Sequence, residues 1–181
     1  LRSATVLAVG PGFGQGEWAR KLFSVVLESS LPMVVDADAL SLLAAEPSHR
    51  ENWILTPHPG EAARLLGISI DNIEDDRLSA AVALQKKYGG VVVLKGAGTV
   101  ITDASGEIAI CSEGNPGMAS GGMGDVLTGV IAGLVAQGCI LPEAAKQGVC
   151  LHGHAADLAA KEGQRGLLAS DLFPVLRSLV G

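Results

Sequence analysis

The sequence has few basic residues and gathers none of them into a cluster. Its 13 Lys and Arg are outnumbered by 19 Asp and Glu, which gives a net charge of -6 at pH 7. A protein that binds the phosphates of DNA or RNA needs a basic surface. The charge balance therefore argues against nucleic acid as a partner.

Cysteines and long apolar runs are also scarce. Cys111, Cys139 and Cys150 lie far apart in the sequence without CxxC or Cys/His ligand spacing, so we expect reduced, buried thiols and a cytoplasmic setting. The most apolar stretch, 126–141, is broken by glycines and is shorter than the roughly 20 residues of a membrane helix. No signal-peptide pattern opens the sequence, and we expect no membrane association.

The 181 residues, 48% of them hydrophobic, are enough for one domain with a real core, and we expect residues 1–181 to form a single domain. Short runs rich in Val and Ile alternate with longer helical patterns, as is typical of βα units in a parallel sheet. The expected fold class is therefore α/β. Strands are predicted over 5–9, 33–36, 53–56 and 91–94, a hairpin over 100–111, and helices over 17–27, 39–45, 61–66, 76–88 and from 124 onward, with breaks at Pro142 and 163–166.

The strongest functional signal is the glycine-rich segment 115–125, which leads directly into the apolar helix near Val126. Glycines in this density allow backbone N–H groups to converge on an anion at a helix N-terminus, where the helix dipole also favours negative charge. We predict that Gly121, Gly122 and Gly124 form an anion hole for phosphate. The segment lacks the Lys-Ser/Thr ending of a P-loop, so any cationic help must come from elsewhere in the chain.

Asp125 ends this segment and has two interpretations. A carboxylate in the first turn of a helix stabilises that helix by about 0.3–1 kcal/mol, which is a purely structural role. Beside bound phosphate, the same carboxylate can accept the proton of an attacking hydroxyl during phosphoryl transfer. We assign Asp125 as the candidate catalytic base.

The second signal is the segment 91–99, in which a buried-type strand ends at Lys95, followed by Gly96 and Gly98. Open α/β sheets bind ligands at the carboxyl ends of their strands, where a lysine charge suits a nucleotide phosphate. The alternative is a surface lysine followed by an ordinary turn. The glycine-rich segment downstream favours nucleotide contact.

The third signal is Thr56 to Glu61. Pro57 fixes its own φ and Pro59 keeps His58 out of the helical region, so His58 is rigidly aimed. The same prolines could form only a stiff turn that starts the next helix. His152 and His154 do not have the i, i+4 spacing of metal ligands, and we predict structural roles for both.

The fourth signal is the loop 10–16, which follows the first strand. Its match to the dinucleotide-binding GxGxxG pattern is poor. Asp36 and Asp38 could assist Mg²⁺ or substrate, and Asp38 could equally be the N-cap of the following helix.

Taken together, five segments resemble the ADP/ATP-dependent NAD(P)H-hydrate dehydratases, a carbohydrate-kinase-like family. The resemblance implies a ribokinase-like three-layer α/β/α sandwich with a mostly parallel sheet. Family members usually carry another glycine-rich strand-and-helix segment before the point where this sequence begins, so we expect the N-terminal part of that fold to be missing. The matching segments are 10–14, 35–40, 56–61, 95–99 and 119–125.

The resemblance also implies site residues. Lys95, Gly96, Ala97, Gly98, Thr99 and Gly124 would contact ADP or ATP, and Gly12, His58 and Asp125 would contact the hydrated nicotinamide nucleotide, NADHX or NADPHX. The implied reaction phosphorylates the C6 hydroxyl of the (6S) hydrate and then eliminates phosphate, with Mg²⁺ bridging nucleotide oxygens.

Two other functions remain open at this stage. A kinase of the same fold, acting on a vitamin-precursor alcohol such as a hydroxymethylpyrimidine or thiazole alcohol, would share the glycine-rich segment and Asp125. A non-catalytic nucleotide-binding module is the second alternative. The resemblance to this family further implies a homo-oligomer and a fused or partner NAD(P)H-hydrate epimerase.

Overall fold

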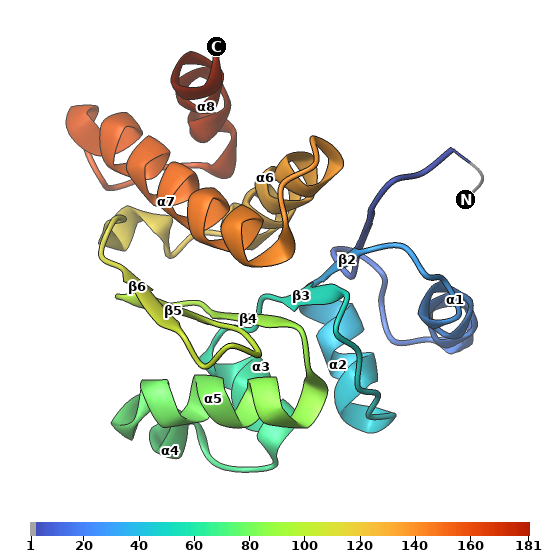
Figure 1. Ribbon diagram of the computed structural model, residues 1–181. Coiled ribbons are helices and arrows are strands. Elements are labelled where there is room, and N and C mark those ends of the chain that lie inside the picture. The colour runs from blue at the N-terminus through green and yellow to red at the C-terminus, as the bar shows by residue number, and fades with distance from the viewer. Residues whose placement is uncertain (1–2) are drawn as a thin grey trace.

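One six-stranded sheet forms the centre of the protein, whose computed structural model describes residues 3–181 (Figure 1). The strands lie side by side in the order in which they occur in the chain. The first four strands are parallel to one another. The last two form the predicted hairpin, in which the fifth strand pairs antiparallel with both the fourth and the sixth. The strands are β1 (Leu7–Val9), β2 (Met33–Val35), β3 (Trp53–Leu55), β4 (Val91–Leu94), β5 (Thr99–Thr102) and β6 (Ile108–Cys111).

Helices cover both faces of the sheet and complete three layers, with the two groups separated along the chain (Figure 1). Crossovers between parallel strands are almost always right-handed, so consecutive strands laid down in one direction place their connecting helices on one face. The first face carries α1 (Glu17–Leu27), α2 (Ala37–Ala45), α3 (Pro59–Leu66), α4 (Ile70–Asp75) and α5 (Arg77–Tyr88). The other face carries α6 (Met123–Ala136) and α7 (Leu141–Ala159), with α8 (Leu172–Val180) packed on α7.

Two apolar cores follow from the alternation of side chains along the strands. In β2, Met33 and Val35 face the core beneath α1 to α5, whereas Val34 faces the core beneath α6 and α7. Trp53 and Tyr88 fill the first core and are fully buried. The indole Nε1 of Trp53 donates a hydrogen bond to the Tyr88 carbonyl at 3.1 Å, so this large aromatic side chain leaves no donor unpaired.

The predicted elements are all present, with some differences at their ends. The single helix expected over 76–88 is preceded by a separate short helix, α4, and each of the two has its own side-chain N-cap, Ser69 and Asp76. The helical pattern breaks close to Pro142 as expected, since α6 ends at Ala136 and α7 begins at Leu141. Pro142 lies in the first turn of α7, where its missing N–H leaves no hydrogen bond unmade.

The cysteines differ from the expectation of buried, well-separated thiols. Cys111 is buried, but Cys139 is only partly buried and Cys150 is exposed. The Sγ atoms of Cys111 and Cys150 lie 3.7 Å apart, because α7 packs against β6. Among the residues that the structure describes, no helix is long and apolar enough to cross a membrane.

Candidate active site

A cavity of about 870 Å³ lies at the carboxyl ends of the central strands. The residues that follow β2, β3 and β4 form one side of it, and the start of α6 and part of α7 form the other, so segments far apart in the sequence share one site. This is the position at which open α/β sheets bind ligands. The cavity is lined by Asp36, Ala37, His58, Pro59, Glu61, residues 95–99, residues 112–116, Met118, Ala119, Ser120, residues 123–125, Leu127, Val149, His152 and Gly153.

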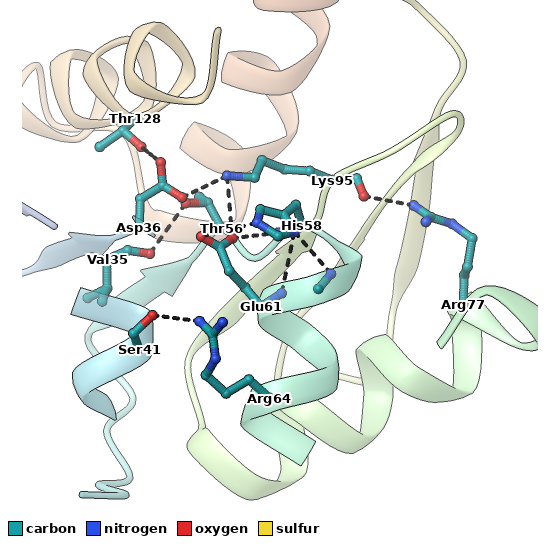
Figure 2. Close-up of polar contacts among 11 residues, drawn as sticks. Val35, Asp36, Ser41, Thr56, His58, Glu61, Arg64, Arg77, Lys95 and Thr128 are labelled. Atoms are coloured by element: carbon teal, nitrogen blue, oxygen red, sulfur yellow. Dashed lines mark hydrogen bonds and ion pairs between the residues drawn. The ribbon is translucent and has the colours of Figure 1, made fainter. Parts of the chain in front are cut away.

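Asp36 is the most buried carboxylate of this cavity, and both of its oxygens have partners. Its side chain is 2% exposed, with Oδ1 2.7 Å from the Nζ of Lys95 and Oδ2 accepting a hydrogen bond from the Thr128 hydroxyl at 2.9 Å (Figure 2). A buried charge is tolerated when it is paired and fully hydrogen-bonded. Strand β2, strand β4 and helix α6 are thereby joined at one point.

His58 and Glu61 form a reciprocal cap at the start of α3. The Nδ1 of His58 accepts hydrogen bonds from the backbone N–H groups of Gly60 at 3.0 Å and Glu61 at 3.4 Å, and the Glu61 carboxylate accepts one from the His58 N–H at 2.8 Å. Because Nδ1 is an acceptor here, the neutral ring carries its proton on Nε2. His58 therefore has the structural role of starting a helix, and it also lines the cavity with a fixed orientation (Figure 2).

Lys95 lies between two carboxylates. Besides its contact with Asp36, its Nζ is 3.9 Å from the Glu61 carboxylate. The backbone around Lys95 is also held, since its N–H donates to the Pro57 carbonyl at 2.8 Å and its own carbonyl accepts from the Arg77 guanidinium at 3.2 Å. The lysine charge is thus fixed in the cavity and does not belong to a surface turn.

The first turn of α6 faces this lysine. The N–H groups of Met123, Gly124 and Asp125 lie before the first intrahelical hydrogen bond, which Val126 makes to Gly122. A Cβ atom at Gly124 would lie 3.2 Å from the Nζ of Lys95. The absence of a side chain at position 124 therefore allows a helix N-terminus and a lysine ammonium to approach each other, which supplies the cationic help that the glycine-rich segment lacks.

Most of the site residues that the sequence suggested come together in this cavity. Lys95, Gly96, Ala97, Gly98, Thr99, Gly124, His58 and Asp125 all line it. Gly121 and Gly122 are exposed, and Gly12 lies in the loop after β1; none of these three is among the lining residues.

Of the two roles considered for Asp38, that of N-cap for the helix after β2 is wrong. Helix α2 begins at Ala37, and Asp38 lies within its first turn. The Oδ2 of Asp38 instead accepts a hydrogen bond from the N–H of Gly14 at 2.8 Å. Asp38 therefore holds the glycine-rich loop that follows β1.

Sequence reasoning missed three residues of the site. Arg77 holds the loop 95–99 by donating to carbonyls of Leu94 and Lys95, and no local pattern indicated this. Thr128 could have been noticed as a polar side chain inside an apolar helix. His152 lies on the cavity wall and is 6% exposed. Its burial, helped by a smaller effect of the Lys95 charge, lowers the pKa of its imidazole to about 4.

The sheet is mostly parallel and lies between two helical layers, and a lysine and a helix N-terminus converge at its carboxyl edge. These features define an α/β protein of the ribokinase-like class. The fold agrees with a ribokinase-like protein from Enterococcus faecalis, which has a TM-score of 0.86 and 32% identity and covers 98% of this chain and 63% of its own. The ribokinase-like three-layer fold expected from the sequence is confirmed.

The chain belongs to the Carb_kinase family, described as NAD(P)H-hydrate dehydratase, whose sequence model matches residues 1–177. It is 60% identical over 181 residues to a bifunctional NAD(P)H-hydrate repair enzyme from Coxiella burnetii, covering 99% of this chain and 37% of that protein. The ADP/ATP-dependent NAD(P)H-hydrate dehydratase from Bacillus subtilis, co-crystallised with ATP and Mg²⁺, has a TM-score of 0.88 and 33% identity, covering 97% and 64% of the two chains. The chain thus spans little more than a third of the bifunctional relative's length.

Proposed function

We propose that this protein dehydrates (6S)-NAD(P)HX to NAD(P)H, with ADP or ATP as the phosphoryl donor. One observation carries the proposal: a lysine, a helix N-terminus and an exposed carboxylate, those of Lys95, α6 and Asp125, face one cavity. The first two features suit a phosphate, and the third suits removal of a proton from an alcohol. The names of the relatives favour the dehydratase over a vitamin-precursor kinase.

The nucleotide would lie along the loop 95–99 with its phosphates toward Gly124. The Lys95 ammonium and the free N–H groups of α6 are held in place before any ligand arrives. Positioned donors of this kind stabilise charge on a moving phosphoryl group without reorganising during the reaction. Arg77 would support the loop through its contacts with backbone carbonyls.

Asp125 would act as the base. Its carboxylate is exposed at the cavity and lacks a hydrogen-bond partner among the described residues, so it is available to a substrate hydroxyl. Removal of the C6 hydroxyl proton accompanies formation of the bond from that oxygen to phosphorus, while the bond from phosphorus to the departing nucleotide breaks. Loss of phosphate from C6 together with a proton from the neighbouring C5 then restores the C5–C6 double bond of the reduced nicotinamide. His58, through Nε2, would bind the hydrated nucleotide, and Gly12 would approach it from the loop after β1.

Mg²⁺ fits the chemistry of this cavity. In the described part of the chain, no three acidic, cysteine or histidine side chains lie close enough together to hold a metal ion by themselves. Mg²⁺ in nucleotide sites is commonly held by one or two carboxylates plus phosphate oxygens, and Asp36 and Glu61 are the carboxylates that line the cavity beside Lys95. Both carboxylates already contact the Lys95 ammonium, so the ion would be held mainly by nucleotide oxygens, and when bound it would neutralise phosphate charge.

The test is the absorbance of reduced nicotinamide after the protein is mixed with NADHX, Mg²⁺ and ADP or ATP. Asp125→Asn should lower the rate by about 10²- to 10⁴-fold, the range typical of general base catalysis, while retaining ADP binding. Glu143→Gln is the matched control, because Glu143 is the acidic residue in the first turn of α7 and does not line the cavity.

Three results would contradict the proposal. A stable phosphorylated alcohol formed from a hydroxymethylpyrimidine or a thiazole alcohol would indicate the kinase. Binding of ADP with no turnover would indicate the nucleotide-binding module. An Asp125→Asn variant that is less stable but equally fast would give this carboxylate only its helix-stabilising role.

Two partners are also proposed for the protein. An NAD(P)H-hydrate epimerase would supply or interconvert the hydrated substrate, as expected for a relative of the bifunctional repair enzymes. A second copy of the chain would form a homo-oligomer, and light scattering of the purified protein would measure its mass in solution.

A further inference from the structure

The carboxylate of Asp157, on α7, holds the residues at which the glycine-rich segment begins. Its Oδ2 accepts a hydrogen bond from the backbone N–H of Gly114 at 2.9 Å, and its Oδ1 accepts one from the Nδ2 of Asn115 at 2.8 Å. Gly114 and Asn115 line the cavity, whereas Asp157 is not among the lining residues. Asp157 therefore affects the cavity through the residues that it holds.

The contact with Asp157 fixes the amide of Asn115. While its Nδ2 donates to Asp157, its Oδ1 accepts from the N–H of Gly117 at 3.0 Å, and its backbone carbonyl accepts from the N–H of Met118 at 3.0 Å. An amide with a partner at each end has one orientation. Asn115 is the N-cap of the short 3₁₀ helix over 116–118, so Asp157 also determines how this turn is held at the cavity wall.

The segment needs such a contact because little else fixes its backbone there. Residues 112–115 lie outside the helices and strands, and Gly114 has a φ of 111°, which glycine adopts easily along with many other conformations. Partial burial acts to raise the pKa of the Asp157 carboxyl, but the hydrogen bonds from Asn115 and Gly114 outweigh it and keep the pKa below its usual value. Hydrogen bonds to an ionised carboxylate are stronger than those between neutral groups.

We propose that Asp157 is a positioning residue that keeps the start of the glycine-rich segment in the arrangement that receives the nucleotide. The inference rests on the proposed function, because it takes ADP or ATP as the ligand. Without Asp157, only a fraction of the molecules would have the segment in place, and the apparent affinity falls by that fraction. Bound nucleotide would restore the arrangement. The KM for ADP should therefore rise, while kcat at saturating ADP stays nearly the same.

The first test measures ADP affinity by titration calorimetry, well below the melting temperature of each variant, and KM and kcat with NADHX as the substrate. Asp157→Ala should bind ADP about 5- to 10-fold more weakly, the effect of one hydrogen bond, with a matching rise in KM. Asp103→Ala is the matched control. Asp103 also accepts from one backbone N–H and one side chain, but it lies in the turn between β5 and β6 and does not line the cavity.

The second test reverses the Asp157–Asn115 pair and is read without ligand, by hydrogen exchange at the N–H groups of Gly114 and Gly117. Asp157→Asn can no longer accept at both ends, so exchange at one or both of these groups should become faster. Adding Asn115→Asp gives every donor an acceptor again, because the amide at position 157 can donate to the carboxylate at position 115. The double variant should therefore recover slow exchange at both groups.

Several outcomes would overturn the inference. They are equal ADP affinity in Asp157→Ala and the unmodified protein, a fall in kcat with no change in KM, or unchanged exchange at Gly114 and Gly117. If Asp157→Ala does not fold, Asp157→Asn and the double variant decide, and a double variant that exchanges as fast as Asp157→Asn overturns it. Failure of the unmodified protein to bind ADP would overturn the proposed function, and hydrogen exchange would then decide separately whether Asp157 fixes the segment.

Discussion

The Nζ of Lys95 lies 2.7 Å from the Oδ1 of Asp36, and 59 residues of chain separate the two. Lys95 directly follows β4 and Asp36 directly follows β2, with β3 between these two strands in the sheet. This contact serves both the fold and the site. It neutralises the buried Asp36 carboxylate, and it fixes the Lys95 ammonium that faces α6.

Removing the lysine should therefore destabilise the protein. Lys95→Met leaves Asp36 buried with Thr128 as its remaining partner, and breaking a buried ion pair typically costs about 3 kcal/mol or more. Urea unfolding monitored by circular dichroism would measure the loss. Lys146→Met, which breaks an exposed contact with Glu107, should change little.

The double variant Lys95→Met with Asp36→Asn provides a check on this explanation. It removes the unpaired charge along with its partner, so part of the lost stability should return. A double variant no more stable than Lys95→Met alone would show that packing of the lysine side chain, and not its charge, sustains the structure.

Replacing Ala37 with glycine should stabilise the folded protein. Its φ of 49° lies in the left-handed region, where an alanine side chain is strained by about 1–2 kcal/mol. It follows Asp36 and lines the cavity, a common place for strained backbone. Ala37→Gly should raise the free energy of unfolding by roughly 1 kcal/mol, less the entropy that glycine adds to the unfolded chain. A fall in the melting temperature would contradict this reading of the backbone.

The two neighbouring cysteines should react at very different rates. Burial raises the pKa of the Cys111 thiol to about 11, whereas Cys150 is exposed. Because the thiolate is the reactive form, iodoacetamide at pH 8 should alkylate Cys150 well before Cys111, and mass spectrometry of peptides would count the products. Cys150→Ser should leave Cys111 equally slow. Rapid labelling of Cys111 in the folded protein would be inconsistent with its burial.

Acid should weaken the fold through His152. Its pKa falls from 6.5 in the unfolded chain to about 4 in the folded protein, so the unfolded chain binds this proton first as the pH drops. The stability that His152 provides is present above pH 6.5 and is lost between there and about pH 4. His152→Gln should flatten this part of the stability curve, while His154→Gln should not. An unchanged acid dependence in His152→Gln would assign the effect to other groups.

The sequence predicted the strands and the glycine-rich loop before α6 well because both signals are local. Short apolar runs such as Val91 to Leu94 indicate buried strands wherever they occur, and the glycines before α6 indicate a loop at a helix start. The site residues that were predicted, including Lys95 and Asp125, lie directly beside such signals.

The features that were missed depend on contacts between distant segments. Thr128 reaches Asp36 across 92 residues, and Cys150 reaches Cys111 across 39, which no spacing rule reveals. His152 was correctly expected within a helix, but its place on the cavity wall follows from how α7 packs. Helix α4, which precedes the helix expected over 76–88, was missed because six residues are too few for a helical period to show.

The sheet order β1 to β6 has a consequence for how the protein is made. Every strand pairs with the one that left the ribosome just before it, so the sheet can grow in the order of synthesis without waiting for a later partner. The site cannot. Asp36 is synthesised early, gains Lys95 only when β4 has emerged, and gains Thr128 only with α6. The nascent chain therefore has an ordered sheet well before the candidate site is complete, and a ligand of that site can stabilise only the nearly finished protein.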